Sequence, residues 1–290
     1  MRFQELLDTT QFLRIAELEA PKGVDTSDLL RIADSLRGKA HAVLVPEMSG
    51  AIMRMGSIGA SCLLKQKGIE AIVSMNCRDR NRLALQADML SAFSLGLENL
   101  SISEGDEIKS GDHIEAKPAN DLNVLGLLEA IKKLHKGIDL AGNDLTGIPK
   151  FCVGSEVNAG LEGGALEIEV MEMEKKIRAG ANYFFTPTMY DLKNFENFMK
   201  KVAPFKVPIF PRVTILNSVG MARFMCRHME GVLIPEEVLN RLSKAPDKQK
   251  EGIAIAADTI KDLRDMCRGV LLVAIGGQER ISAVLDRVGA

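Results

Sequence analysis

The 290-residue sequence lacks several features that mark particular classes of protein. Its five cysteines are spread along the chain without a CxxC pair, so we expect neither a disulfide framework nor a zinc site. No apolar run approaches the roughly 18 residues that cross a bilayer, and the first residues, MRFQELLDTTQF, lack the apolar centre of a signal peptide. The formal net charge of −2 provides no excess of positive charge with which to bind a nucleic acid or a membrane surface. We therefore predict a cytoplasmic protein that binds neither nucleic acid nor membrane.

Several short motifs with a known chemistry are also missing. The sequence has no G-x-G-x-x-G after its first apolar run, no Walker motif and no G-x-S-x-G. Its four histidines show no metal-ligand spacing, so no metal site is predicted. With no tryptophan and two tyrosines, the core is expected to rely on aliphatic side chains and on the fourteen methionines.

The feature that is present throughout is a rhythm of short apolar runs, each followed by a segment long enough for a helix. Eight such units in 290 residues favour a closed parallel barrel over an open sheet. The predicted strands are Phe12–Glu19, Ala42–Pro46, Ala71–Asn76, Asn99–Ser103, Phe151–Val157, Tyr183–Met189, Pro208–Ile215 and Gly269–Ile275.

Amphipathic segments between these runs predict the helices, among them Arg80–Leu95 and Leu166–Ala179. Two segments, Pro235–Leu242 and Glu251–Met266, lie between the seventh and eighth strands, so this crossover is expected to contain extra helix. No linker or low-complexity tract divides the chain. The prediction is one (β/α)8 TIM barrel domain over residues 1–290, in the α/β class.

Barrels of this kind carry their chemistry at the C-terminal ends of the strands, and polar residues are expected there. Glu17 and Glu19 both stand at the exit of the first strand, and the two-residue period of a strand points them to the same side. A carboxyl group that faces a barrel mouth is partly desolvated, which raises its pKa and suits a general acid. The alternative is an ion pair with Arg or Lys at the rim.

Three other segments are candidates for binding. The run CRDRN places Arg78 and Arg80 after the third strand, where they could bind phosphate, although Asp79 could instead cap the next helix. The sequence Glu104-Gly105-Asp106 ends the fourth strand and combines a flexible backbone with acceptors. Gly276-Gly277 after the eighth strand is a further candidate for phosphate.

These pieces, in this order, resemble the methylenetetrahydrofolate reductase family, whose members are FAD-dependent barrels of one-carbon metabolism. The resemblance extends from about residue 12 to the C-terminus. The segments that carry it are Ala16-Glu17-Leu18 with Pro21-Lys22-Gly23, CRDRNRLALQADML, Gly105-Asp106 with GDHIEAKP, DLAGNDLTGIPKFCVG, KKIRAGANYFFT, IPEEVLNRL and GIAIAADTI.

The resemblance implies roles for particular residues. In the family, the glutamate of the first strand protonates the bridging one-carbon unit of the folate, and Glu17 matches it. The acidic residue after the fourth strand lies near the flavin and tunes it, and here this residue is Asp106. Further residues at positions that the resemblance associates with FAD binding are Arg78, Asp79, Arg80, Asn120, Lys176 and Ala181.

The sequence departs from the family pattern on the substrate side. Pro46-Glu47-Met48 stands where a Thr-Asp-Asn-like run is common. Thr186 is followed by Pro187 where the family has Thr-Gln, and Arg212 replaces a small residue. Proline cannot donate a hydrogen bond, so Pro46 and Pro187 cannot hold a pterin as an amide does. Pro46, Thr186, Pro187 and Arg212 are therefore the candidate substrate-binding positions of a divergent member.

The resemblance implies an oxidoreductase that passes hydride from reduced flavin to a methylene-bearing, folate-type carrier and yields the methyl form. A nicotinamide cofactor or an electron-donating protein subunit would reduce the flavin, and an oligomer is expected. The departures leave two alternatives open. One is a flavin barrel that acts on another pterin or imine, and the other is a non-catalytic subunit that binds flavin or a partner in an electron-transfer complex.

Overall fold

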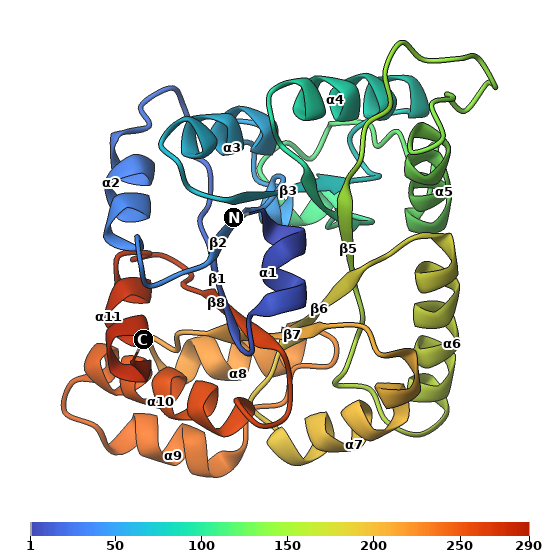
Figure 1. Cartoon of the computed structure of the whole chain (residues 1–290). Helices are drawn as coiled ribbons and strands as arrows, with labels where there is room; N and C mark the ends of the chain where they lie inside the picture. The colour runs from blue at the N-terminus through green and yellow to red at the C-terminus, as the bar shows by residue number, and fades with distance from the viewer. Residues whose placement is uncertain (1, 290) are drawn as a thin grey trace.

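The computed structural model describes residues 2–289 and contains a closed parallel barrel of eight strands, in which each strand pairs with its sequence neighbours and β1 pairs with β8. Helices surround the barrel (Figure 1). The predicted (β/α)8 fold is confirmed. The strands are β1 (Leu13–Glu17), β2 (Ala42–Val45), β3 (Ala71–Asn76), β4 (Asn99–Ser103), β5 (Cys152–Glu156), β6 (Tyr183–Thr188), β7 (Ile209–Thr214) and β8 (Gly269–Val273).

Side chains alternate between the barrel interior and the helix-facing side, as the two-residue period of a strand requires. In β1, Leu13 and Ile15 belong to the interior cluster, whereas Ala16 and Leu18 pack under the helices. The interior contains three aromatic rings, those of Tyr183, Phe185 and Phe210, which contact one another edge-on or at a tilt. The barrel is therefore a packed core whose chemistry is confined to its ends.

The helices begin at side-chain caps in several cases. Asn81 and Asn123 accept backbone N–H groups at the first turns of α4 and α5, and Asp247 does the same for α10. The helices are α1 (Phe3–Thr9), α2 (Ser27–Ser35), α3 (Ser57–Gln66), α4 (Arg82–Ser94), α5 (Val124–Leu134), α6 (Gly163–Ala179), α7 (Leu192–Val202), α8 (Val219–His228), α9 (Glu236–Lys244), α10 (Lys248–Leu263) and α11 (Arg280–Val288). Three of them, α8 to α10, lie between β7 and β8, which confirms the enlarged crossover.

Helix α1 closes the N-terminal end of the barrel, and in Figure 1 it lies within the ring of strands. Its Phe3 is fully buried and meets the ring of Tyr183 edge-on at a centroid distance of 5.2 Å. The sequence alone indicated only a polar N-terminus. The structure leaves the opposite, C-terminal end of the barrel as the open one.

Six strands are one to three residues shorter than predicted, whereas β3 and β4 have their predicted bounds. β1 ends at Glu17, two residues before the predicted end, so Glu19 lies beyond the strand. β6 changes register against β7 between Phe185 and Thr188, where Pro187 has no N–H to contribute to the ladder. In residues 2–289, no helix is long and apolar enough to span a membrane.

Candidate active site

A cavity of about 450 Å³ lies at the C-terminal mouth of the barrel. The alternation of side chains along a strand explains which residues reach it. In β1, β5 and β7, the residue two positions after Ile15, Gly154 and Phe210 again points to the barrel interior. These next residues are Glu17, Glu156 and Arg212, and all three line the cavity. The sheet geometry thus places two carboxylates and a guanidinium in one layer above the apolar core.

Glu17 is the most enclosed ionisable group of this layer, with 8% of its surface exposed. Burial raises the pKa of its carboxyl group, and the nearby carboxylates of Glu19, Glu156 and Asp106 act in the same direction, whereas Arg212 opposes them. Within residues 2–289, no hydrogen-bond donor lies in bonding geometry with the Glu17 carboxyl. Such a carboxyl group is suited to take up a proton and to release it to a ligand in the cavity.

Glu19 forms an ion pair at the rim of the barrel, which was the alternative prediction for the two glutamates. Its carboxylate lies 2.7 Å from the Arg54 guanidinium and its side chain is 34% exposed. The two glutamates therefore differ in environment although they stand two residues apart. One faces the cavity and the other is an ion-pair partner at the surface.

Arg212 stands between the two carboxylates of the mouth. Its Nη2 lies 3.6 Å from Glu17 and 3.9 Å from Glu156, and its Nε is buried without a hydrogen-bond acceptor in the described chain. Both distances exceed the usual N–H···O range of about 2.7–3.2 Å. The guanidinium is thus shared electrostatically and bound closely by neither acid.

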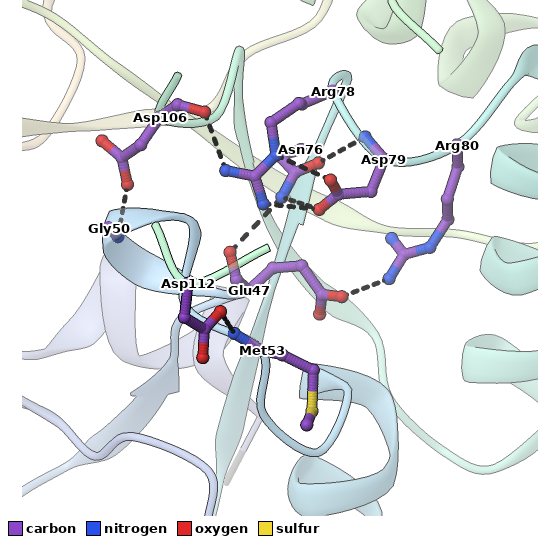
Figure 2. A network of polar contacts seen from close by, with 9 residues as sticks. All are labelled: Glu47, Gly50, Met53, Asn76, Arg78, Asp79, Arg80, Asp106 and Asp112. Atoms are coloured by element: carbon purple, nitrogen blue, oxygen red, sulfur yellow. Dashed lines mark hydrogen bonds and ion pairs between the residues drawn. The ribbon is translucent and has the colours of Figure 1, made fainter. Parts of the chain in front are cut away.

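Asp106 follows β4 and reaches the loop after β2. Its carboxylate accepts the N–H of Gly50 at 2.7 Å, while its backbone carbonyl accepts Arg78 Nη1 at 2.8 Å (Figure 2). The preceding Gly105 has φ +89°, and a Cβ there would lie 3.1 Å from the Cβ atoms of Arg78 and Asn76. Glycine is required here by both the backbone conformation and the close approach.

Arg78 and Asp79 form a closed pair after β3. Arg78 Nε and Nη2 both donate to the Asp79 carboxylate, which also accepts Asn76 Nδ2 at 2.9 Å (Figure 2). Although burial alone would raise it, these hydrogen bonds lower the pKa of Asp79. The alternative in which Asp79 caps the next helix is wrong, because Asn81 accepts the N–H groups of Leu83 and Ala84.

Arg80 connects the loop after β3 to the loop after β2. Its guanidinium is paired with the buried carboxylate of Glu47 (Figure 2) and, 3.0 Å away, with Asp88. Glu47 also accepts the N–H of Ser57, at the start of α3. Pro46, immediately before it, lines the cavity. In the segment Pro46-Glu47-Met48, which departs from the family pattern, Pro46 lines the cavity, whereas the Glu47 carboxylate links Arg80 to the start of α3.

A second cavity, of about 620 Å³, adjoins the first and shares Glu104, Gly105 and Asp106 with it. It is formed by the long excursion between β4 and α5, and Arg78 and Asn120 contribute to its wall. Lys109 and Lys117 also line it, and neither has an ion-pair partner among residues 2–289. The two adjoining cavities can accommodate a long ligand, with free cations in the outer one.

The structure brings some of the remaining candidates to the cavity and places others elsewhere. Lys176 lines the mouth, where its Nζ donates to the Glu156 carbonyl at 2.8 Å. Ala181 is buried in the turn before β6, at the opposite end of that strand from the mouth. Thr186 and Pro187 lie in β6 outside the cavity lining, and the Thr186 hydroxyl donates to the Pro187 carbonyl.

Sequence reasoning missed several wall residues. Glu156 was not singled out, although it stands at the exit of a predicted strand as Glu17 does. Small hydroxyl side chains at the ends of β3, β4 and β5 also line the cavity: Ser74, Ser101, Ser103 and Ser155. The two-residue period of a strand could have found two of these residues, because Glu156 is in phase with the interior Cys152 and Ser74 with the interior Ile72.

The described residues offer no metal centre and no activated thiol in the mouth. No group of three or more His, Cys, Asp or Glu side chains in residues 2–289 is arranged to hold a metal ion. Burial raises the pKa of Cys77, after β3, to about 12, which keeps that thiol protonated. The ionisable chemistry of the mouth therefore consists of carboxylates with Arg212 and Lys176.

A closed (β/α)8 barrel with a buried carboxyl group and an elongated cavity at its C-terminal mouth has the architecture of a barrel enzyme. The model of the methylenetetrahydrofolate reductase family matches residues 2–289, so the chain belongs to this family and the resemblance is confirmed. Methylenetetrahydrofolate reductase 1 of Schizosaccharomyces pombe (strain 972) is 22% identical over 237 residues, which cover 76% of this chain and 36% of that protein. The chain thus spans about a third of the length of that relative.

Solved structures show the same fold. A Clostridium thermocellum protein that binds two copies of 5-methyl-5,6,7,8-tetrahydrofolic acid matches with a TM-score of 0.66 at 14% identity, over 99% of this chain and 97% of that one. DmoA from Hyphomicrobium sulfonivorans matches with a TM-score of 0.52 at 8% identity, over 96% of this chain and 86% of that one. At these identities the likeness concerns the fold alone.

Proposed function

We propose that the chain is a flavin-dependent reductase that converts a methylene-bearing, folate-type carrier to its methyl form, with Glu17 as the proton donor. Family membership supports the reaction class, and the folate-binding Clostridium thermocellum protein with the same fold supports the carrier class. The observation that carries the proposal is Glu17, a carboxyl group with a raised pKa on the wall of the mouth cavity.

The residues present fit FAD. The two adjoining cavities offer a continuous wall for a long molecule, and Lys109 and Lys117 in the outer one are free to face a diphosphate. Asp106, Arg78 and Asn120 would hold the cofactor at the boundary and along the outer cavity. When bound, FAD would supply the hydride that reduces the carrier.

The chain's own residues would bind the carrier and move a proton. Glu17 would hold a proton on its carboxyl group and transfer it to a nitrogen bonded to the bridging carbon, so that this C–N bond breaks, the ring opens and the carbon becomes an electrophilic iminium carbon. The serine hydroxyls of the mouth offer hydrogen bonds that Pro46, in the same wall, cannot provide. The reductant for the flavin would be a nicotinamide cofactor or an electron-donating protein subunit.

A second candidate is a flavin barrel for another pterin or imine, or a non-catalytic flavin-binding subunit. The observation that favours it is Arg212, whose guanidinium lies 3.6 Å from the Glu17 carboxylate in the mouth. A protein that binds FAD but neither binds nor reduces methylenetetrahydrofolate would support this second candidate.

The test compares Glu17→Gln with Glu19→Gln. After reduction of the bound flavin with dithionite, we expect the Glu17 variant to pass hydride to methylenetetrahydrofolate about 10²–10⁴-fold more slowly than wild type. Flavin content and flavin reduction should be unchanged, because neither needs a proton from Glu17. The Glu19 variant is the control, since its carboxylate is paired with Arg54 outside the mouth. Equal rates in wild type and the Glu17 variant would refute the assignment.

A further inference from the structure

The relation between Arg212 and Glu17 has consequences beyond charge neutralisation. Among residues 2–289, Arg212 is the one cation within ion-pair distance of the Glu17 carboxylate, and that carboxylate has no hydrogen-bond donor of its own. Arg212 is therefore the one nearby group that favours the carboxylate form of Glu17, against burial and the acidic neighbours. A general acid that must carry a proton would be opposed by a guanidinium that stays beside it.

Arg212 has an alternative position in the same mouth. Its Nη2 is 3.9 Å from Glu156, whose side chain is 53% exposed, and its Nε has no acceptor. Because neither carboxylate holds the guanidinium at hydrogen-bond distance, a small displacement toward Glu156 exchanges one long ion pair for a shorter one. A ligand that occupies the space beside Glu17 would favour this displacement.

The other charged groups around Glu17 do not offer a second partner for it. Besides Glu17 itself, acidic groups reach the mouth from the ends of β2, β4 and β5, and Lys176 from α6 is bound to the Glu156 carbonyl. Arg54 is paired with Glu19. Interior side chains near the ends of β3 and β6 are uncharged, and β8 ends in Val273. The acidic groups that line the mouth are Glu47, Glu104, Asp106 and Glu156, whereas Glu19 lies outside it, beyond β1.

We propose that Arg212 is a positioning residue that couples the charge of Glu17 to ligand binding. In the free mouth its guanidinium favours the carboxylate form of Glu17, and a bound carrier moves the guanidinium toward Glu156, so that Glu17 takes up a proton from solvent. Glu17 is then protonated, and able to act as an acid, only when a carrier is bound beside it. This inference rests on the proposed function for its ligand, but its first half concerns the free protein alone.

The first test measures the free protein without ligand. Glutamate carboxyl carbons are labelled with ¹³C, the Glu17 signal is assigned by its loss in Glu17→Gln, and its titration is followed by NMR. Arg212→Met, which keeps a long side chain, should move the titration upward by about one pH unit or more. Arg212→Lys should stay close to wild type. Arg54→Met, the matched control, removes a cation from the same rim and should leave the Glu17 titration unchanged.

Two results would overturn the first half: an unmoved Glu17 titration in a folded Arg212→Met protein, or an equal displacement in Arg54→Met. Thermal unfolding checks the fold of each variant. If Arg212→Met does not fold, Arg212→Gln, with its neutral polar end, takes its place, and the same titration decides.

The second test measures proton uptake on binding. Calorimetric titration with 5-methyltetrahydrofolate, in buffers of different ionisation enthalpy, should show close to one proton taken up by wild type and almost none by Arg212→Met. Binding by wild type without proton uptake would overturn the coupling. If wild type binds no reduced folate, the proposed function fails, and the ligand-free titration decides the role of Arg212 independently.

Discussion

At the scale of single residues, the barrel interior leaves no space beside Gly154 in β5. A Cβ at this position would lie 2.1 Å from Cε2 of Tyr183. That ring cannot retreat easily, because its hydroxyl donates to the Leu100 carbonyl at 2.8 Å and its edges meet Phe3 and Phe185. We expect Gly154→Ala to lower the free energy of unfolding by about 1–3 kcal/mol, as overpacking does, in a urea titration.

The matched control for this substitution is Gly164→Ala, in the first turn of α6. A Cβ at Gly164 meets no atom within 4 Å, so the added methyl should leave stability unchanged or raise it by up to about 1 kcal/mol. If both variants were destabilised equally, the cause would be the replacement of glycine itself and not the contact with Tyr183.

Sequence reasoning was strongest for residues whose position follows from one strand alone. Glu17 could be placed at the exit of the first predicted strand, and the family resemblance singled it out from Glu19, but only the structure shows that it faces the cavity. The partnership of Arg212 with Glu156 could not be predicted, because it joins β7 to β5 across the closed barrel and depends on the register of the strands between them. The same holds for the pairing of Arg80 with Glu47.

At the scale of elements, α1 acts as the plug of the barrel's closed end. Phe3 belongs to the same interior cluster as Leu13, Tyr183 and Phe210, although it lies outside the strands. The helix spans seven residues, so its stability depends on this packing more than on its own propensity. Because this packing involves residues far away in the sequence, the sequence alone did not indicate helix α1.

Replacement of Phe3 by alanine should therefore destabilise the whole domain. We expect a loss of about 3–5 kcal/mol in the free energy of unfolding, since a fully buried aromatic side chain is removed and its cavity cannot collapse easily. Chemical denaturation followed by circular dichroism measures it. Gln4→Ala, on the exposed side of the same helix, is the control and should be nearly neutral. A small loss in Phe3→Ala would show that α1 is dispensable for the barrel.

At the scale of the whole molecule, one acidic side chain ties together three loops of the mouth. Asp112, in the excursion after β4, is paired with Lys22 from the loop after β1 and accepts the Met53 N–H of the loop after β2 at 2.9 Å. The pairing with Lys22 holds the pKa of Asp112 below its usual range, and hydrogen bonds from His113 and Met53 act the same way. Figure 2 shows Asp112 beside Met53, next to the Asp106–Gly50 contact.

This link should control how often the excursion opens over the outer cavity. In Asp112→Ala we expect amide hydrogen exchange in residues 107–117 and at Met53 to accelerate by on the order of tenfold, with an unchanged melting temperature, because the loops open locally while the barrel remains closed. Since the pKa of Asp112 is lowered, its stabilising contribution is present above the unfolded value of about 3.9 and is lost only as the pH falls through the lower folded value. Wild-type exchange, corrected for the intrinsic rate, should thus be unchanged between about pH 7 and 5. Asp144→Ala, in an exposed loop, is the control, and equal acceleration in both variants would contradict the link.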